Sequence, residues 1–396
     1  MPIKQPIWTK SFLNISISNL FIFIVFYALL TLLPIYVTEE MGGSESQAGL
    51  IITIFLLSAI IVRPFSGRLI DRFGKKKMLV ASAALFAAAS FLYPLVDHYV
   101  ALLLLRFFHG VWFSIVTTAA GGIAADTIPR ERRGEGLGYF AMSMNLAVVT
   151  GPFIALTLLQ YVSYTAIFLV LSGIMTIGVL CTLGVKTIEN SAPAPRHSLT
   201  FHDLFEKKSF PIAIVGLFVA FSYASVISFI SLYAKSIGLL EAAGFFFAVF
   251  AVAMLVSRPF TGRMFDVRGP NTVILPAFVL FALGLVMLSL TTESWMLLFA
   301  GGLIGLGYGS IVPSFQTLAI QAAPESRSAH ATATFFTFFD TGIASGSFVL
   351  GIVVTTIGYA NLYMILGIFV IGILFFYQWI QKQKKAEKQL QSQTNY

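Results

Sequence analysis

The sequence contains few charged residues and almost no cysteine. Only 11% of its 396 residues are charged, whereas 57% are hydrophobic. A soluble domain carries about a quarter charged residues, so the polar side chains here cannot cover a water-facing surface. Most of the chain must therefore face lipid. The single cysteine, Cys181, excludes an intrachain disulfide.

Several chemical motifs are also absent from the sequence. The five histidines are scattered, so no metal site is expected. The sequence has no phosphate-binding loop and no convincing nucleophile with a paired base and acid. We therefore expect neither an enzyme nor an ATP-driven pump, and no cofactor.

The net charge of +8 at first suggests an anionic partner such as nucleic acid. However, if the N-terminus is cytoplasmic, 21 of the 25 basic residues fall in segments on the cytoplasmic side. This is the positive-inside distribution of membrane proteins. It predicts that both termini are cytoplasmic and that nucleic acid is not a partner.

Long apolar runs are what the sequence has in abundance. A membrane-spanning helix needs about 20 consecutive apolar residues, and twelve such runs are present. They lie at about 11–37, 46–67, 78–96, 100–125, 136–160, 163–185, 210–234, 241–264, 272–291, 295–320, 329–355 and 359–380. This pattern predicts an all-α integral membrane protein with twelve transmembrane helices. The first run is longer than the apolar part of a signal peptide, and we expect it to remain as a span.

The two sets of six spans repeat one another. The stretch RPFSGRLIDRFG at 63–74 returns 195 residues later as RPFTGRMFDVRG at 258–269, with seven of twelve positions identical. The polar segment 186–209 contains two prolines and is typical of a linker. We therefore predict two pseudo-symmetric six-helix bundles at 1–185 and 210–381, the linker at 186–209, and a cytoplasmic tail at 382–396 that is largely disordered.

Two parallel repeats of six helices are typical of secondary transporters. The stretch GRLIDRFGKKK at 67–77 resembles the signature between the second and third helices of the major facilitator superfamily, and the resemblance extends over nearly the whole chain. It implies alternating access and a cytoplasmic latch that closes when the substrate site faces outward. The residues that match this latch are Gly67, Asp71, Lys75, Asp126, Gly262 and Asp266.

The second copy of the latch is incomplete, because Lys75 corresponds to Pro270 and Asp126 to Gln321. The resemblance thus implies a Lys75–Asp126 ion pair in the first repeat only. The alternative is that these charged residues only anchor the topology at the membrane surface.

Two ionisable residues lie deep in predicted spans, where an unpaired charge costs several kcal/mol. Asp340 is expected to exchange protons, because burial favours the protonated form of a carboxylic acid. Alternatively, it is a structural acid or anchors a cationic substrate. Arg106, followed by Gly110, resembles a family element that takes part in the proton response. The alternative is a clamp that bonds backbone carbonyls of a neighbouring helix.

Polar and aromatic side chains in the spans are candidates for a central substrate cavity, although aromatic residues are ordinary in any such bundle. The candidates are Asn19, Tyr27, His109, Trp112, Asn145, Tyr223, Gln316, Phe336 and Phe339. His109 lies three residues after Arg106 and so on the same helix face; the alternative is a histidine that only satisfies its own hydrogen bonds. Asn145 in the first repeat is the equivalent of Asp340 in the second.

Gly151 and Pro152 in the span at 136–160 resemble a glycine- and proline-containing signature of exporters in the family. A small residue permits close helix packing, and proline kinks a helix. The sequence therefore favours a proton-coupled exporter of a small amphipathic molecule or drug. The alternative is a proton symporter or facilitator for uptake of a sugar or organic acid. We expect a monomer in the lipid bilayer of a bacterial cell membrane, with a small-molecule substrate and protons as partners.

Overall fold

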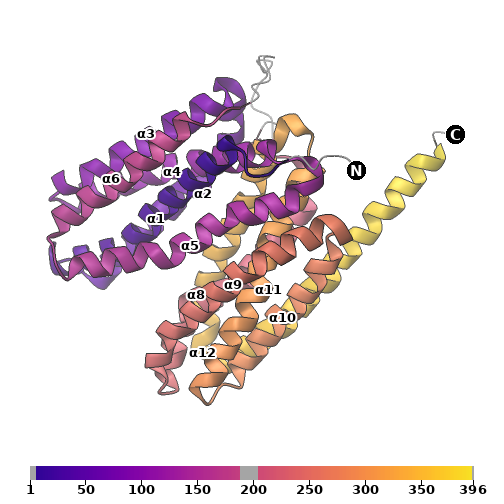
Figure 1. The fold of residues 1–396 in the computed structure, drawn as a ribbon. Helices are drawn as coiled ribbons and strands as arrows, with labels where there is room; N and C mark the ends of the chain where they lie inside the picture. The colour runs from indigo at the N-terminus through magenta and orange to yellow at the C-terminus, as the bar shows by residue number, and fades with distance from the viewer. Residues whose placement is uncertain (1–5, 188–203, 395–396) are drawn as a thin grey trace. The chain divides into compact units, whose positions relative to one another are not determined.

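The computed structural model describes residues 6–187 and 204–394, so residues 188–203 of the predicted linker lie outside the described part of the chain. The described residues form long α-helices and no strands (Figure 1). The first six helices are α1 Lys10–Glu39, α2 Glu45–Phe73, α3 Lys75–Leu92, α4 Tyr99–Thr127, α5 Arg133–Leu159 and α6 Tyr164–Leu183. They are followed by α8 Phe210–Ser236, α9 Leu240–Arg268, α10 Asn271–Ser289, α11 Ser294–Ala322 and α12 Ser328–Thr394. Short 3₁₀ turns are η1 Tyr93–Leu95, η2 Arg130–Arg132, η3 Lys207–Ser209 and η4 Glu325–Arg327.

Eleven helices in the described part of the chain are long and apolar enough to cross a membrane. The last of them, α12, contains two spans, because its backbone leaves the helical conformation at Gly358 (φ 77°, ψ 166°). This break falls between the two spans predicted at 329–355 and 359–380. The all-α membrane fold with twelve spans is thus confirmed.

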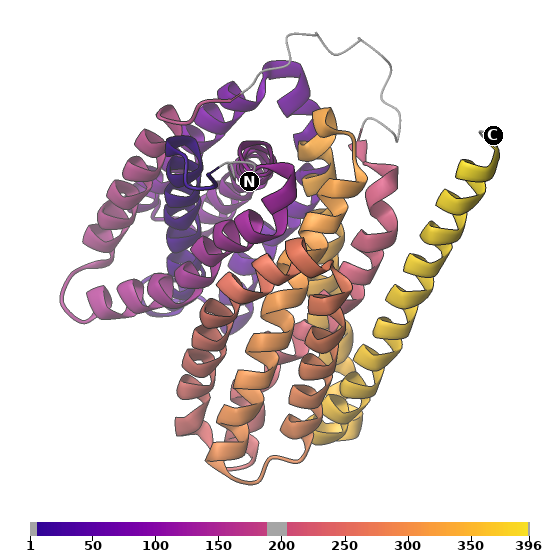
Figure 2. The ribbon, with the colours of Figure 1, turned by 45° about the vertical axis from the view of Figure 1, so that its right-hand side comes forward.

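The C-terminal tail differs from the prediction. We expected disorder after residue 381, but α12 continues as a helix to Thr394, which Figure 2 shows in yellow. The physical reason is local: the tail is rich in Lys and Gln, which are good helix formers, and it contains no proline or glycine.

Helix ends follow from local sequence signals. Ser44 and Gln47 form a capping box at the start of α2, each side chain bonding the other's backbone N–H. The α2–α3 connection turns at Gly74 (φ 92°), and the equivalent turn after α9 lies at Gly269 (φ 89°), 195 residues later. Only glycine adopts such a positive φ at little cost, which explains why both repeats have glycine there.

The described chain divides into two compact units. Unit 1 comprises Met1–Lys207 with Ile320–Thr337, and unit 2 comprises Lys208–Ala319 with Phe338–Tyr396. In unit 1, α1 packs against α5 and α6, while α2 and α3 pack against α4. In unit 2, α9 packs against α8 and α10. The start of α12 thus belongs to unit 1, whereas its remainder belongs to unit 2.

Equivalent glycines make equivalent helix contacts in the two units. Gly110 of α4 lies against the backbone carbonyl of Phe55 in α2, and Gly305 of α11 lies against that of Phe250 in α9. Both members of the second pair follow the first by 195 residues. The sequence repeat is therefore a structural repeat, since a side chain at either glycine would push the same two helices apart.

Candidate functional site

The turn at Gly74 places Asp71, in the last turn of α2, close to Lys75 at the start of α3. The Nζ of Lys75 lies 2.5 Å from Oδ2 of Asp126, near the end of α4. The side chains of Lys75 and Asp126 are 15% and 27% exposed, so the pair is partly shielded from solvent. The two residues that the sequence paired are thus in contact, while their part in gating stays a prediction.

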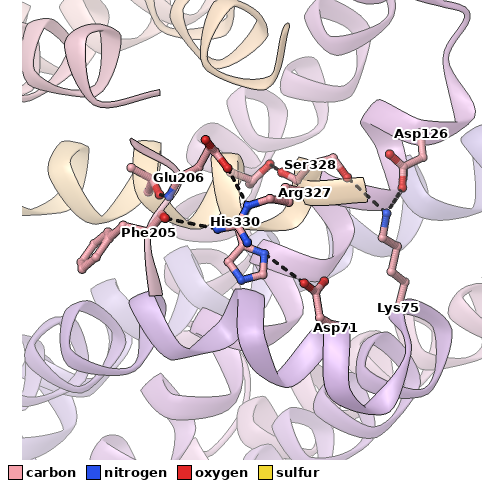
Figure 3. Close-up of polar contacts among 10 residues, drawn as sticks. Asp71, Lys75, Asp126, Phe205, Glu206, Arg327, Ser328 and His330 are labelled. Atoms are coloured by element: carbon pink, nitrogen blue, oxygen red, sulfur yellow. Dashed lines mark hydrogen bonds and ion pairs between the residues drawn. The ribbon is translucent and has the colours of Figure 1, made fainter. Parts of the chain in front are cut away.

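Asp71 contacts a residue that the sequence did not suggest. The Nδ1 of His330 in α12 lies 3.4 Å from Oδ2 of Asp71, and the His330 side chain is only 2% exposed (Figure 3). Gly67 makes this approach possible, because a Cβ there would lie 2.9 Å from Cγ of His330. Sequence spacing gives no sign of the pairing, since the equivalent of His330 in the first repeat is Glu135.

Other contacts also hold the start of α12 against the first repeat. Lys75 Nζ donates to Oγ of Ser328 over 3.3 Å, next to its contact with Asp126. Gly122 of α4 lies close to Ala329, where a Cβ would come within 3.2 Å of the backbone. We call Asp71, Lys75, Asp126, Ser328 and His330 the latch cluster. It gathers the ends of α2, α3 and α4 around the first turn of α12.

The 3₁₀ turns beside the latch cluster carry an exposed ion pair. Arg130 of η2 bonds Glu325 of η4, two residues at equivalent positions of the repeats. Arg133 lies 3.8 Å from the same carboxylate. Arg130 and Glu325 are 66% and 57% exposed, so solvent screens this pair and it contributes little to stability.

The end of the linker also joins this region, which the sequence did not predict. Arg327 Nε donates to Oε2 of Glu206 over 2.6 Å and Arg327 Nη2 to the carbonyl of Phe205 over 3.2 Å. The backbone N–H of Glu206 donates to Oγ1 of Thr334 over 2.9 Å. These hydrogen bonds therefore tie the residues before η3 to η4 and to the start of α12 (Figure 3).

The second copy of the latch motif lies in unit 2. Gly262 is buried in α9, and Asp266, in the last turn of that helix, is half-buried. Gly262 and Asp266 thus belong to unit 2, and of the two copies of the motif only the first contributes residues to the latch cluster.

Arg106 is fully buried in unit 1. Its Nε donates to the carbonyl of Ile51 in α2 over 3.5 Å, and its Nη1 to the hydroxyl of Tyr93 over 3.4 Å. The guanidinium carbon lies 4.1 Å from the centre of the Phe55 ring, a cation–π contact. The carbonyl contact is of the kind that the clamp alternative describes.

His109 belongs to the same buried group. Its Nδ1 lies 2.9 Å from the Tyr93 hydroxyl and its ring stacks on Phe86 with centroids 3.8 Å apart. His109 and Phe86 are both fully buried. The structure thus places this cavity candidate in a packed interior between α3 and α4.

The remaining cavity candidates of unit 1 lie on α1, α4, α5 and α12. Asn19 donates to Oγ of Ser143 over 2.8 Å, which joins α1 to α5. A Cβ on Gly151 would lie 2.8 Å from Tyr27, so the predicted packing glycine is also at the α1–α5 contact. The other residues named from sequence are the buried Asn145, the half-buried Trp112, Pro152 inside α5, and Phe336, whose ring lies 5.5 Å from the Arg63 guanidinium.

Unit 2 contains the other candidates. Tyr223 of α8 stacks on Tyr308 of α11 with ring centroids 3.7 Å apart. Gln316 is 4% exposed, and Phe339 and Asp340 of α12 are half-buried. In the described part of the chain, no group of three His, Cys, Asp or Glu side chains is arranged to hold a metal ion.

The sequence and the fold of this chain are similar to those of known proteins. A sequence model of the family described as Major Facilitator Superfamily matches residues 15–272 and 212–395. The multidrug resistance protein MdtG of Dickeya zeae is 25% identical over 98% of this chain and 98% of its own length. MdtG of Enterobacter lignolyticus is also 25% identical, over 87% of this chain and 86% of its own length.

A solved structure with the same fold is the human organic anion transporter MFSD10. It has a TM-score of 0.80 and 14% sequence identity, over 94% of this chain and 100% of the solved one. At that identity the similarity shows the fold alone.

Proposed function

The chain belongs to the Major Facilitator Superfamily and is a secondary transporter, and on that premise we propose that it exports a small amphipathic molecule or drug in exchange for protons. The observation that carries the proposal is the similarity to a multidrug resistance protein over 98% of both chains. A match of that extent includes both repeats and the linker. Alternating access of the two six-helix repeats would move the substrate outward.

The latch cluster supports the conformational part of this proposal. Its contacts join residues of the first repeat to the first turn of α12, which belongs to the second repeat. Contacts of this kind stabilise one endpoint of a transport cycle and must break to reach the other. We therefore assign Gly67, Asp71, Lys75 and Asp126 to a latch on the cytoplasmic side.

Two residues support the coupling part of the proposal. Arg106 carries a permanent charge in the interior of unit 1, and Asp340 is a half-buried carboxylate in a span of unit 2. Ionisable groups inside membrane spans mark proton and substrate pathways. We assign Asp340 to proton exchange and Arg106 to the proton response.

The orientation of the chain is part of the same proposal. The positive-inside distribution puts both termini in the cytoplasm. A fluorescent protein fused after residue 396 should then fluoresce, while alkaline phosphatase at the same position, which needs an oxidising compartment for its disulfides, should be inactive. The reverse pattern would contradict the assigned orientation. We further propose that the transporter acts as a monomer.

The proposed function is tested by ethidium accumulation in bacteria that lack their own major pumps. Cells with empty vector, with the protein, with its Asp340→Asn variant and with a Glu293→Gln control would be compared, each with and without a protonophore. Glu293 is an exposed carboxylate outside the spans, so its loss should leave transport unchanged. We expect the protein to lower accumulation, and both the protonophore and Asp340→Asn to abolish this effect.

The other outcomes also decide between hypotheses. Unchanged accumulation with the protein present in the membrane would contradict broad drug export and favour uptake of a sugar or organic acid. Export that persists in Asp340→Asn with its normal pH dependence would exclude Asp340 as the coupling residue.

A further inference from the structure

Arg106, Tyr93, His109 and Ser90 form a buried series of hydrogen bonds, and the chemistry of the side chains indicates which atom donates in each bond. A guanidinium only donates, so the Tyr93 oxygen accepts from Arg106 Nη1. The single hydroxyl proton of Tyr93 is then available to the Nδ1 of His109, 2.9 Å away. In the arrangement that gives this proton an acceptor, His109 Nδ1 accepts it and carries no proton of its own.

The donor and acceptor roles can also be assigned on the other side of the His109 ring. A neutral ring without a proton on Nδ1 carries it on Nε2, which faces Oγ of Ser90 at 3.4 Å. The hydroxyl of Ser90 donates in turn to the carbonyl of Phe86 over 3.0 Å, which leaves its oxygen free to accept. Arg106, Tyr93, His109 and Ser90 thus form one chain in which each hydroxyl and ring N–H has an acceptor.

The two repeats share the aromatic residues around this polar chain but differ at the polar residues themselves. The aromatic residues that frame it are kept in the second repeat, where Phe55 and Phe86 correspond to Phe250 and Phe281. The four polar members have no polar equivalent in the second repeat. Arg106 and Tyr93 correspond to Gly301 and Leu288, and His109 and Ser90 correspond to Ile304 and Leu285. The second repeat therefore forms its helices without any of the four polar members.

We propose that Tyr93 is the positioning residue of Arg106, and that His109 acts as a permanently neutral acceptor that orients the Tyr93 hydroxyl. This inference rests on the proposed role of Arg106 in the proton response. The carbonyl of Ile51 and the Tyr93 hydroxyl hold Nε and Nη1, whereas Nη2 of Arg106 has no acceptor among the residues that the structure describes. The oriented tyrosine keeps Nη2 as the donor that is available to a new partner during transport.

The neutral state of His109 follows from the same contacts and distinguishes it from a proton carrier. A proton on Nδ1 would remove the acceptor of the Tyr93 hydroxyl proton, because the other close partner of that hydroxyl, Arg106 Nη1, only donates. Protonation would therefore break the chain that holds the arginine. His109 is a structural partner of Tyr93 and no part of the proton pathway.

The positioning role is tested by the pH profile of ethidium transport in everted membrane vesicles. Losing one hydrogen bond to a charged group corresponds to about tenfold or more, so Tyr93→Phe should lower the rate by about that factor and flatten its pH dependence. His109→Leu should do the same. His109→Asn should retain the wild-type profile, because its Oδ1 accepts in place of Nδ1. Tyr161→Phe is the matched control, since Tyr161 is 78% exposed.

The state of His109 is tested without any transport measurement. Nitrogen NMR of the histidine-labelled protein in liposomes, taken as the difference from His109→Asn, should show a neutral ring protonated on Nε2 from about pH 5 to pH 8. A doubly protonated ring, or a proton on Nδ1, would overturn the proposal even if Tyr93→Phe fails to fold.

The two measurements separate this inference from the proposed function. If ethidium is not transported but His109 shows the expected tautomer, the export proposal fails and the hydrogen-bond chain stands. If ethidium is transported and Tyr93→Phe keeps the wild-type pH profile, the positioning role of Tyr93 is wrong.

Discussion

Gly67 lies directly against His330, and the lack of a side chain at this position lets the start of α12 reach α2. Little room remains between the two residues, because a Cβ on Gly67 would lie 2.9 Å from Cγ and 3.1 Å from Cα of His330. The Cα belongs to the backbone, so a rotamer change of His330 cannot remove the whole conflict. The contact between Asp71 and His330 therefore depends on glycine, without a Cβ, at position 67.

The first prediction concerns this contact. Gly67→Ala should destabilise the closed latch by about 1–3 kcal/mol, the usual cost of overpacking, and should slow ethidium export. The measurement is the export rate in cells with equal amounts of protein in the membrane. Gly49→Ala is the matched control, because Gly49 is in the same helix and a Cβ there would have no neighbour within 4 Å. Equal rates for the two variants would show that the close approach at Gly67 is not needed for transport.

At the scale of the element, α12 combines two spans that meet at Gly358. The break has a positive φ and an extended ψ, a combination that is accessible almost only to glycine. A Cβ at Gly358 would have no atom within 4 Å, so the requirement for glycine comes from the backbone conformation and not from packing. The predicted spans at 329–355 and 359–380 left only a short connection here, and glycine makes that connection possible.

The second prediction follows from this backbone conformation. Gly358→Ala should lower the stability of the protein by about 1–3 kcal/mol, since alanine is strained at this φ and ψ. The control is Gly372→Ala in the same helix, which also has no neighbour within 4 Å but has helical geometry. Alanine there should raise the stability by up to about 1 kcal/mol. Thermal unfolding in detergent measures both, and similar midpoints would contradict the assigned break.

At the scale of the whole molecule, transport requires that one conformation does not dominate the others. The latch cluster joins the first repeat to the first turn of α12 through the contacts of Asp71 with His330 and of Lys75 with Ser328. Loss of one partner of a partly buried charged group leaves that group uncompensated. Removing the charge of Asp71 should therefore shift the balance between the two endpoints of the cycle. Membrane insertion depends on the apolar spans and should not change.

The third prediction tests this balance. Asp71→Asn should lower the rate of ethidium export several-fold while the amount of protein in the membrane stays the same. Asp97→Asn is the control, because Asp97 is an exposed carboxylate in the connection between η1 and α4. Export by Asp71→Asn at the wild-type rate would remove the latch from the mechanism.

The sequence by itself determined the membrane class, the twelve spans and the two repeats, and through the resemblance it also paired Lys75 with Asp126. These features depend on local properties, because the thickness of the bilayer sets the length of a span and the chain must satisfy its own backbone within each span. The helix end at Gly74 and the helix break at Gly358 are also local features, because glycine adopts the positive φ that each of them needs.

Only the tertiary structure decided which distant side chains meet. His330 lies against Asp71, Glu206 bonds Arg327, and Tyr93 joins Arg106 to His109. The sequence could not supply these partners, because hydrogen bonds and ion pairs act over a few ångströms whereas Asp71 and His330 are far apart along the chain. What brings them together is the packing of helices at small residues such as Gly67 and Gly122, and a glycine in a sequence does not name its neighbour.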